Sequence, residues 1–477
     1  MVPAQAEETG MRDIFFVGYL LALLFIAFKR PFLFTLVYAY VDIVSPQRLS
    51  YFMLNSVPVS LIVFGLAFLG YMFADDKKDS RFSVRQGLMI LLLLYCFYTT
   101  IQSAVPEAAW AKWDWVWKAM IFAIFLPFTL KTRLRIEALA LFMVLCAGTL
   151  IIAGGIKTLA GGGGYGVLVM QIDVNYGLFE GSTASMVAIA IIPLIYWLAK
   201  FGTIFPPDWR VRFFAWAFIF ACLLIPIGTQ ARTGLVCIVV LVVLTLRFNK
   251  YRFLYAGLGL ALGVMSIPFL PQSYTDRMET LENVEADESA ATRLAVWRWT
   301  IDYVKEHPFG GGFDVYLVNR LTYDLADDGK KEDWEIEYDI DNNGPMEVID
   351  EGRAFHSSYF EMLGEQGFPG LALWLMIHFG GIWRMEVLRR RYKNTEKESE
   401  LWVAPLAVAL QNGHIIYLVG ALFVGIAYQP FVYMLVAMQI GLDTYMTRRS
   451  AEAKWRPIVK KVSLAARPDV IAGNKAW

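Results

Sequence analysis

Long apolar runs separated by short polar connections dominate the pattern along this chain. A helix needs roughly 17 to 25 mostly apolar residues to cross a bilayer, whose core offers no water to bond the backbone. About thirteen runs approach this length, and because the first two are short enough to form a hairpin, a count of twelve remains open. The predicted spans lie at residues 13–28, 31–45, 57–74, 87–104, 115–130, 136–153, 183–199, 212–229, 232–247, 252–270, 368–387, 403–424 and 427–446. The pattern therefore predicts an all-α polytopic membrane protein.

Lysine and arginine are concentrated in every second connection between the predicted spans. The strongly basic connections are 75–86, 131–135, 247–252 and 388–400, and those with about one basic residue each are 46–56, 105–114 and 154–182. Basic loops stay on the cytoplasmic side of a membrane. The alternation predicts a multi-pass protein of the bacterial inner membrane, with a basic cytoplasmic tail.

One connection of about ninety residues is far longer than the others, and the alternation places it in the periplasm. Long loops in compact proteins are usually functional. In its first half, apolar residues recur at intervals of three and four, from Leu294 through Trp297 and Ile301 to Val304. This spacing predicts an amphipathic helix that lies on the membrane surface or against the bundle. The second half is dense in aspartate and glutamate, as is typical of a solvated insertion.

These features divide the chain into four parts. The predicted parts are an N-terminal bundle of about ten spans (1–270), a large periplasmic loop (271–367), C-terminal spans (368–446) and the basic cytoplasmic tail (447–477).

Composition and charge narrow the class further. Hydrophobic residues make up 57% of the 477 positions and charged residues only 18%, below the share in an average soluble domain. The net charge is zero, so no electrostatic argument points to nucleic acid as a partner. All four cysteines lie inside apolar runs, which argues against an extracellular disulfide framework. The first run ends at Lys29 and Arg30 without a small-residue cleavage site, so we expect no cleaved signal peptide.

The motifs of soluble enzymes do not occur in this sequence. We find no HExxH, GxSxG or Walker pattern and no histidine cluster that suits a metal. We therefore predict neither a metal nor a cofactor. Ionisable residues placed where a bilayer makes them costly are the remaining candidates for chemistry.

Three basic residues are candidates for anion binding. Arg232 lies between two apolar runs at the expected periplasmic edge of a tight turn, and Arg293 opens the predicted loop helix. A guanidinium group binds two phosphate oxygens at once, so two converging arginines would suit a diphosphate. The alternatives are snorkelling for Arg232 and a plain surface charge for Arg293. Lys118, near the periplasmic end of a span, could bind an anion or snorkel beside its aromatic neighbours.

Histidine is the side chain best able to exchange a proton near neutral pH. His356 stands where the large loop returns to the membrane, and both a catalytic and a structural role are open for it. His307 lies in a turn before Pro308. His378 and His414 lie within spans, where we expect them to pack against or bond to neighbouring helices.

The segment from Asp339 to Asp350 matches the ligand positions of a calcium loop, except that aspartate replaces glutamate at the last position. Flanking helices are not evident, and chance matches are easy in so acidic a segment. Calcium binding at this loop therefore stays open.

Two segments together resemble the signature region of the O-antigen ligase and polymerase superfamily. In TRLAVWRWTIDYVKEHPFGGGF (292–313) an arginine-led helix precedes a proline- and glycine-rich turn, and in FHSSYFEMLGEQGFPGLALWL (355–375) a histidine precedes an E-x-G-x-x-G helix entry. The resemblance extends to KRPFLFTLVYAYVDIVSPQRLSYF, to YGLFEGSTAS (176–185) and to the last two spans. It covers almost the whole chain and is closest to the O-glycosylation ligases found with exosortase systems.

This resemblance implies a metal-independent membrane glycosyltransferase of polysaccharide or lipopolysaccharide biosynthesis in the cell envelope. Its donor would be a glycan on undecaprenyl diphosphate, and transfer to an acceptor hydroxyl would occur at the periplasmic face. By their matching positions, Arg232 and Arg293 would bind the diphosphate, His356 would activate or position the hydroxyl, and Lys118 would lie near the donor phosphates.

The sequence departs from the family pattern at two places and leaves several questions open. It has Glu180, Gly181 and Ser182 where relatives carry an acidic-Asn-Asn run, and its acidic insertion before His356 is longer than expected. The acceptor could be a lipid, a glycan or a protein. A polymerase would share the ligase machinery, and a polysaccharide or lipid transporter is a third, weaker alternative, because no repeat or paired broken helices occur. The sugar composition and the oligomeric state are not determined.

Overall fold

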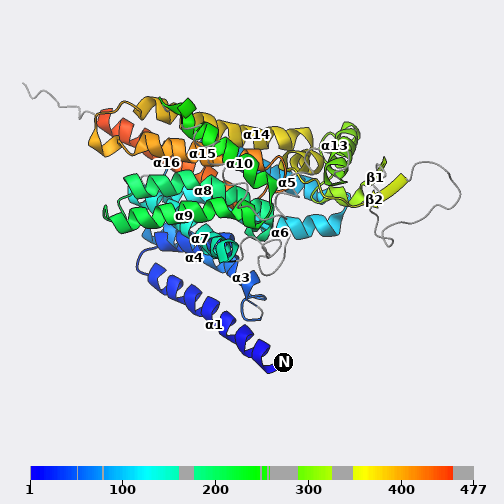
Figure 1. Ribbon diagram of the computed structural model, residues 1–477, viewed down its shortest axis with the longest axis horizontal. Helices are drawn as coiled ribbons and strands as arrows, with labels where there is room; N and C mark the ends of the chain where they lie inside the picture. The colour runs from blue at the N-terminus through cyan, green and yellow to red at the C-terminus, as the bar shows by residue number, and fades with distance from the viewer. Residues whose placement is uncertain are drawn as a thin grey trace, which may run out of the picture.

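The computed structural model describes residues 2–50, 52–77, 80–160, 177–247, 250–254, 257, 288–324 and 347–454. Within these residues, helices form almost all of the regular structure (Figure 1). The helices outside the large loop are α1 (Val2–Ala27), α2 (Phe32–Val44), α3 (Pro46–Leu49), α4 (Val59–Ala74), α5 (Val84–Ile101), α6 (Pro106–Thr129), α7 (Arg133–Ala160), α8 (Gly181–Phe201), α9 (Trp209–Gly228), α10 (Arg232–Leu246), α14 (Ser358–Tyr392), α15 (Val403–Gly420) and α16 (Pro430–Lys454).

The helices coincide with the predicted spans. Every predicted span has a helix in the described part of the chain except 252–270, most of which lies outside it. Among the described helices, seven are long and apolar enough to cross a membrane, and α2, α4 and α10 are shorter apolar helices. The prediction of an all-α polytopic membrane protein is confirmed.

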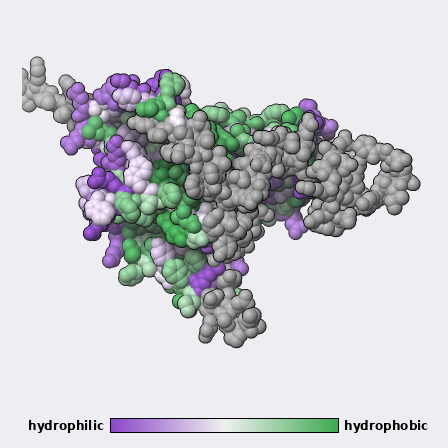
Figure 2. All heavy atoms as spheres, in the orientation of Figure 1, coloured by the Kyte–Doolittle hydropathy of each residue, from purple (hydrophilic) through white to green (hydrophobic). Residues whose placement is uncertain are grey.

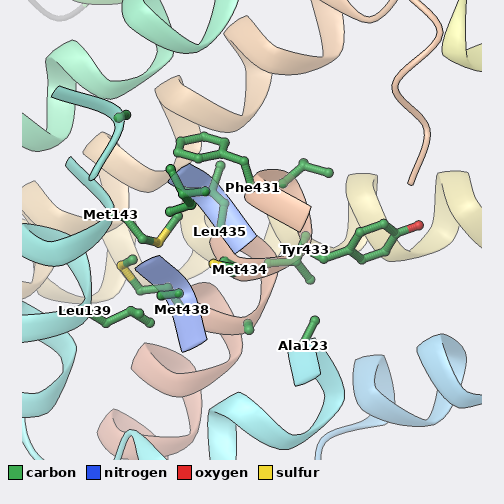
Figure 3. Packing of buried hydrophobic residues seen from close by; sticks show 14 of the residues in the cluster. Ala123, Leu139, Met143, Phe431, Tyr433, Met434, Leu435 and Met438 are labelled. Carbon is green, nitrogen blue, oxygen red and sulfur yellow. The ribbon is translucent and has the colours of Figure 1, made fainter. Parts of the chain in front are cut away.

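The core of the bundle is apolar and closely packed. Met438 of α16 faces Leu139 and Met143 of α7, whereas Tyr433 points away from this group (Figure 3). Close helix contact depends on small residues, as is common in membrane bundles. A Cβ on Gly413 of α15 would lie 2.6 Å from the carbonyl oxygen of Ala190 on α8.

Polar side chains inside the bundle bond to one another. Nδ1 of His378 and Nε2 of His414 lie 2.8 Å apart, and Nε2 of Gln439 donates to Nδ1 of His414 at 3.0 Å. Arg85 in turn donates to Oε1 of Gln439 at 3.5 Å. Such pairing is the usual way to hold polar groups away from water. The expectation that His378 and His414 bond to neighbouring helices is confirmed.

The bundle has two polar ends. At one end, named here the basic end, lie the basic connections that follow α4, α6 and α14. At the other, named here the loop end, lie α13 (Glu288–Glu306), β1 (Arg320–Asp324) and β2 (Glu347–Glu351), on the right in Figure 1. Figure 2 shows hydrophilic residues gathered at the basic end and hydrophobic residues along the visible side of the bundle.

The loop end has a small core of its own, named here the loop core, formed by Val296, Val315, Leu321 and Phe355. The helix predicted from Ser289 to Val304 is confirmed. Leu294 and Ile301 are 49% and 42% exposed. The helix instead buries the stripe of Val296, Thr300 and Val304, because these residues face the loop core and α14.

A two-stranded antiparallel ribbon was not predicted in the large loop. β1 pairs with β2 so that Arg320 lies opposite Glu351 and Asp324 lies opposite Glu347. The two strands flank the acidic insertion. Of the calcium-like segment 339–350, only residues 347–350 lie among the described residues, in β2.

Candidate functional site

Two buried anchors hold His356 in place. On one side, Phe355 is 3% exposed and packs in the loop core. On the other side, Oγ of Ser358 donates to the carbonyl of Val424 at 2.8 Å, ahead of α16. His356 has a φ of 47°, a left-handed conformation that costs an L-residue roughly 1–2 kcal/mol. Because its neighbours are fixed, the fold presents the exposed imidazole of His356 at the loop end.

The charges around His356 come from three separate parts of the chain. Its pKa lies below the ordinary value of 6.5, first because the surrounding protein removes water, although part of the residue remains exposed. The positive charge of Arg293 lowers the pKa further, the carboxylate of Glu180 raises it, and Arg353 lowers it. At neutral pH the imidazole is therefore neutral and able to accept a proton.

Arg293 is positioned by the helix that carries it. One turn later on α13, Nε1 of Trp297 donates to the carbonyl of Phe355 at 2.9 Å. The ring of Trp297 also stacks on Phe360 of α14, with centroids 4.7 Å apart and planes at 5°. These contacts fix the start of α13 beside the residues that flank His356. The structure thus brings Arg293 and His356 together, although 63 positions separate them in the sequence.

Glu180 was not predicted as a site residue. It caps α8, where its carboxylate accepts hydrogen bonds from the backbone nitrogens of Ser182 at 2.9 Å and Thr183 at 2.5 Å. A glutamate directly before Gly-Ser-Thr and an apolar run is a signal for a helix start. Nothing in that signal indicates that α8 begins close enough to His356 for Glu180 to affect its pKa.

Arg232 is the first residue of α10, next to the start of α8. The preceding turn has Gln230 at a φ of 51°, and Oγ1 of Thr229 lies 2.7 Å from Oγ of Ser185 on α8. A Cβ on Gly234 would lie 2.9 Å from Cβ of Ser185. Arg232 therefore stands beside the same helix end that Glu180 caps. The starts of α8 and α10, which carry partial positive charge, face the loop end together.

Lys118 is placed differently from the two arginines. Its Nζ forms an ion pair with Asp114 at 2.8 Å, one turn earlier on α6. Its backbone carbonyl accepts a hydrogen bond from Tyr38 of α2 at 3.3 Å, and its ammonium lies 5.7 Å from the ring centre of Trp117. These contacts do not join it to Arg232, Arg293 or His356, so its place near the donor phosphates stays a prediction.

Lys112 is a second residue that the sequence did not single out. It lies on the predicted connection 105–114, but α6 begins at Pro106 and includes it. Three carboxylates, from Asp314, Glu361 and Glu365, surround its ammonium group. These partners lie more than two hundred positions away, so local patterns give no signal for the cluster. In the described part of the chain, no group of three or more His, Cys, Asp or Glu side chains could hold a metal ion.

Two family models together match most of the chain. Residues 217–375 match a family model described as O-Antigen ligase, and this segment includes Arg232, Arg293 and His356. Residues 11–203, which include Lys112, Lys118 and Glu180, match a family of unknown function (DUF5935). No curated protein matches the chain.

Proposed function

The chain belongs to the O-antigen ligase superfamily through its residues 217–375, and on this basis we propose that it transfers a glycan from undecaprenyl diphosphate to an acceptor hydroxyl. Membership supports a membrane enzyme that transfers glycans, of the ligase or polymerase kind. The proposed site is the loop end, which the pattern of basic connections assigns to the periplasmic face of the inner membrane. In this proposal the large loop, 271–367, is periplasmic and the tail, 447–477, is cytoplasmic.

One observation carries the proposal: His356 stands at the loop end beside the start of α13, where Trp297, one turn after Arg293, donates to the carbonyl of Phe355 at 2.9 Å. In the proposed reaction the acceptor oxygen attacks the anomeric carbon of the donor sugar, and the hydroxyl proton passes to the imidazole of His356. The bond from the anomeric carbon to the diphosphate breaks, and undecaprenyl diphosphate leaves with the bonding electrons.

The arginines would stabilise the leaving group. Negative charge grows on the diphosphate as the bond breaks, and fixed guanidinium groups aimed at this charge lower the barrier. Arg293 and Arg232 are the proposed ligands, and the start of α10 adds its partial positive charge beside Arg232. We assign Lys118 a secondary role near the donor phosphates. The mechanism uses only side chains of the protein and requires no metal.

Glu180 is proposed to orient the base. Its carboxylate raises the pKa of His356, opposing Arg293, so it stabilises the imidazolium that forms when the hydroxyl proton is taken up. The sequence departs from the family pattern at the next two positions, Gly181 and Ser182, and we associate this departure with the choice of acceptor, which can be a lipid, a glycan or a protein.

The test is transfer from purified lipid-diphosphate glycan in reconstituted membranes that contain a chelator. We expect His356→Ala and Arg232→Ala each to lose activity by about 100-fold or more. Matched controls are His307→Ala, an exposed histidine stacked on Tyr303, and Arg298→Ala, an exposed arginine on α13. Both controls should retain activity.

Each outcome of this experiment has a definite meaning. Full activity of His356→Ala and Arg232→Ala would overturn the site assignment, and activity lost on chelation would overturn the metal-free mechanism. The product separates the two enzyme functions, because a ligase joins the glycan to a different acceptor, whereas a polymerase extends a carrier-linked chain. Movement of an intact lipid-linked glycan across the membrane without transfer would favour the transporter alternative.

A further inference from the structure

A deeply buried ammonium group lies at the loop end, apart from the proposed catalytic residues. Nζ of Lys112 lies 3.1 Å from Oδ1 of Asp314, 2.8 Å from Oε1 of Glu361 and 2.7 Å from Oε1 of Glu365. The side chain of Lys112 is 12% exposed and that of Glu365 is 0% exposed. Burying charges is costly even when they are paired, so a cluster of this kind requires an explanation other than stability.

The cluster joins segments that are far apart in the sequence. Asp314 follows the turn after α13, and both glutamates lie in the first turns of α14. Oε1 of Glu365 also accepts a hydrogen bond from the backbone nitrogen of Asp314 at 3.0 Å. Oε2 of Glu361 accepts one from the backbone nitrogen of Ala427 at 2.9 Å. Lys112 thereby connects α6, the turn after α13, the start of α14 and the connection before α16.

The turn after α13 is seated directly on the backbone of α14. Gly311 donates to the carbonyl of Gly364 at 3.0 Å, and Gly312 donates to that of Glu365 at 2.9 Å. Gly310 has a φ of +89°, and a Cβ there would lie 2.5 Å from the carbonyl oxygen of Glu365. Only glycines allow so close an approach. The position of the turn on α14 therefore depends on short contacts beside the Lys112 cluster.

Arg293 and His356 lie on the two parts that this cluster joins. Arg293 is on α13, which leads into the turn, and His356 precedes Glu361 by five positions. We propose that Lys112 is a positioning residue for glycan transfer. By pairing with Asp314, Glu361 and Glu365, it holds α13 against the start of α14 and so sets the spacing of Arg293 and His356. This inference rests on the proposed function.

Loss of the ammonium would leave three carboxylates facing one another in a buried space. Like charges repel, and a buried carboxylate without a partner is strongly disfavoured. The turn and the start of α14 would then move apart to reach water. A misplacement of about 1 Å at a catalytic group can cost roughly 100-fold in rate. Arg232 lies on α10, outside the cluster, so donor binding should suffer less than the chemical step.

The first test compares three lysine variants in the transfer assay. We expect Lys112→Met to lower kcat by about 100-fold and to change the donor KM by less than about threefold. Lys305→Met is the matched control, because Lys305 forms only an exposed ion pair with Asp302 on α13. Lys112→Arg, which keeps the charge, should recover much of the activity. An unchanged kcat in a folded Lys112→Met protein would overturn the proposal.

A second test does not depend on transfer. Spin labels are attached at Ile301→Cys on α13 and Phe368→Cys on α14, which are 42% and 53% exposed, while the four native cysteines are buried. Pulsed electron resonance then gives the distance distribution between α13 and α14. We expect a narrow distribution with Lys112 and a broadened or displaced one with Lys112→Met. Identical distributions would overturn the proposal.

The two tests separate this inference from the proposed function. If the unmodified protein shows no transfer, the proposed function fails, and the spin-label distances still decide whether Lys112 fixes α13. If transfer is normal and Lys112→Met changes neither kcat nor the distances, the proposed function stands and the positioning role is wrong. Size-exclusion chromatography of each variant confirms that the comparison is made on folded protein.

Discussion

The two ends of the bundle carry charge in different arrangements. At the basic end, charged side chains neutralise each other in close pairs. Asp443 accepts hydrogen bonds from Nε and Nη2 of Arg384 at 3.0 and 2.6 Å. Glu386 accepts hydrogen bonds from Nε and Nη2 of Arg389, each at 2.7 Å. At the loop end, two arginines and one glutamate act on the same histidine, His356, which stands in a left-handed conformation.

The difference supports a structural role for the basic end and the proposed reaction site at the loop end. Bidentate pairs such as Arg384 with Asp443 satisfy both partners, and their main effect is to hold α14 against α16. Backbone strain and charges of both signs around one titratable group are more typical of functional sites. An anion with two phosphates would complement the arginines around His356, whereas Arg384 and Arg389 at the basic end already have carboxylate partners.

The largest expected effect is the loss of activity when an arginine is removed at the loop end, compared with the same change at the basic end. Arg293→Ala should lower kcat/KM by about 100- to 1000-fold, because in the proposed mechanism it removes charge that stabilises the leaving diphosphate. Arg384→Ala makes the same chemical change at the basic end, and transfer per folded molecule should stay within about threefold of the unmodified rate. Steady-state kinetics in reconstituted membranes check both. Equal losses in the two variants would contradict the division between the ends.

The second expected effect is on stability alone. Asp443→Ala removes the carboxylate next to Arg85, whose side chain is 7% exposed. Leaving that guanidinium buried without its carboxylate should lower the free energy of unfolding by about 3–5 kcal/mol. Arg390→Ala is the control. Because Arg390 is 67% exposed, its removal should lower the free energy of unfolding by less than about 1 kcal/mol. Thermal unfolding in detergent measures both, and similar midpoints for the two variants would argue against a structural role for the basic end.

The smallest expected effect is on the pH dependence of transfer. The pKa of His356 lies below 6.5, and the proposed mechanism uses the neutral imidazole, so activity should fall as the pH drops through that lowered pKa. Glu180→Gln removes a charge that raises this pKa, so the acidic limb of the pH profile should move to lower pH. Arg353→Gln removes a charge that lowers it, so the limb should move to higher pH. Shifts of a few tenths to about one pH unit are expected.

Profiles of kcat/KM against pH for these two variants test whether the charges around His356 at the loop end control transfer. Shifts in opposite directions would support His356 as the titrating group. Shifts in the same direction, or none, would mean that another group sets the acidic limb.

Helix positions were largely predictable from the sequence, but the contacts between distant segments were not. Long apolar runs and apolar periodicity located the spans and the loop helix, because contact with lipid or with a protein core requires apolar residues along the length of a helix. They did not determine which face of α13 is buried, where Val296 and Thr300 are inside and Leu294 is outside. The face of α13 that is buried depends on the position of the loop core and α14, which the local sequence pattern does not contain.

The candidate residues show the same limit. Motif resemblance identified Arg232, Arg293 and His356, and the structure brings Arg293 and His356 together while placing Arg232 at the neighbouring helix end. Lys118 was chosen because it is a lysine near the end of a span. Lys112, six positions earlier on the same helix, is the one surrounded by three carboxylates.

The sequence by itself determined that this is a helical membrane protein with a large loop and a family signature, because hydropathy and local motifs act over neighbouring residues. Only the tertiary structure decided that Glu180 lies close enough to His356 to raise its pKa and that Lys112 joins the turn after α13 to α14. The physical reason is that electrostatic interactions depend on distance in space. Charges on helices that are far apart in the chain meet only when the bundle has assembled.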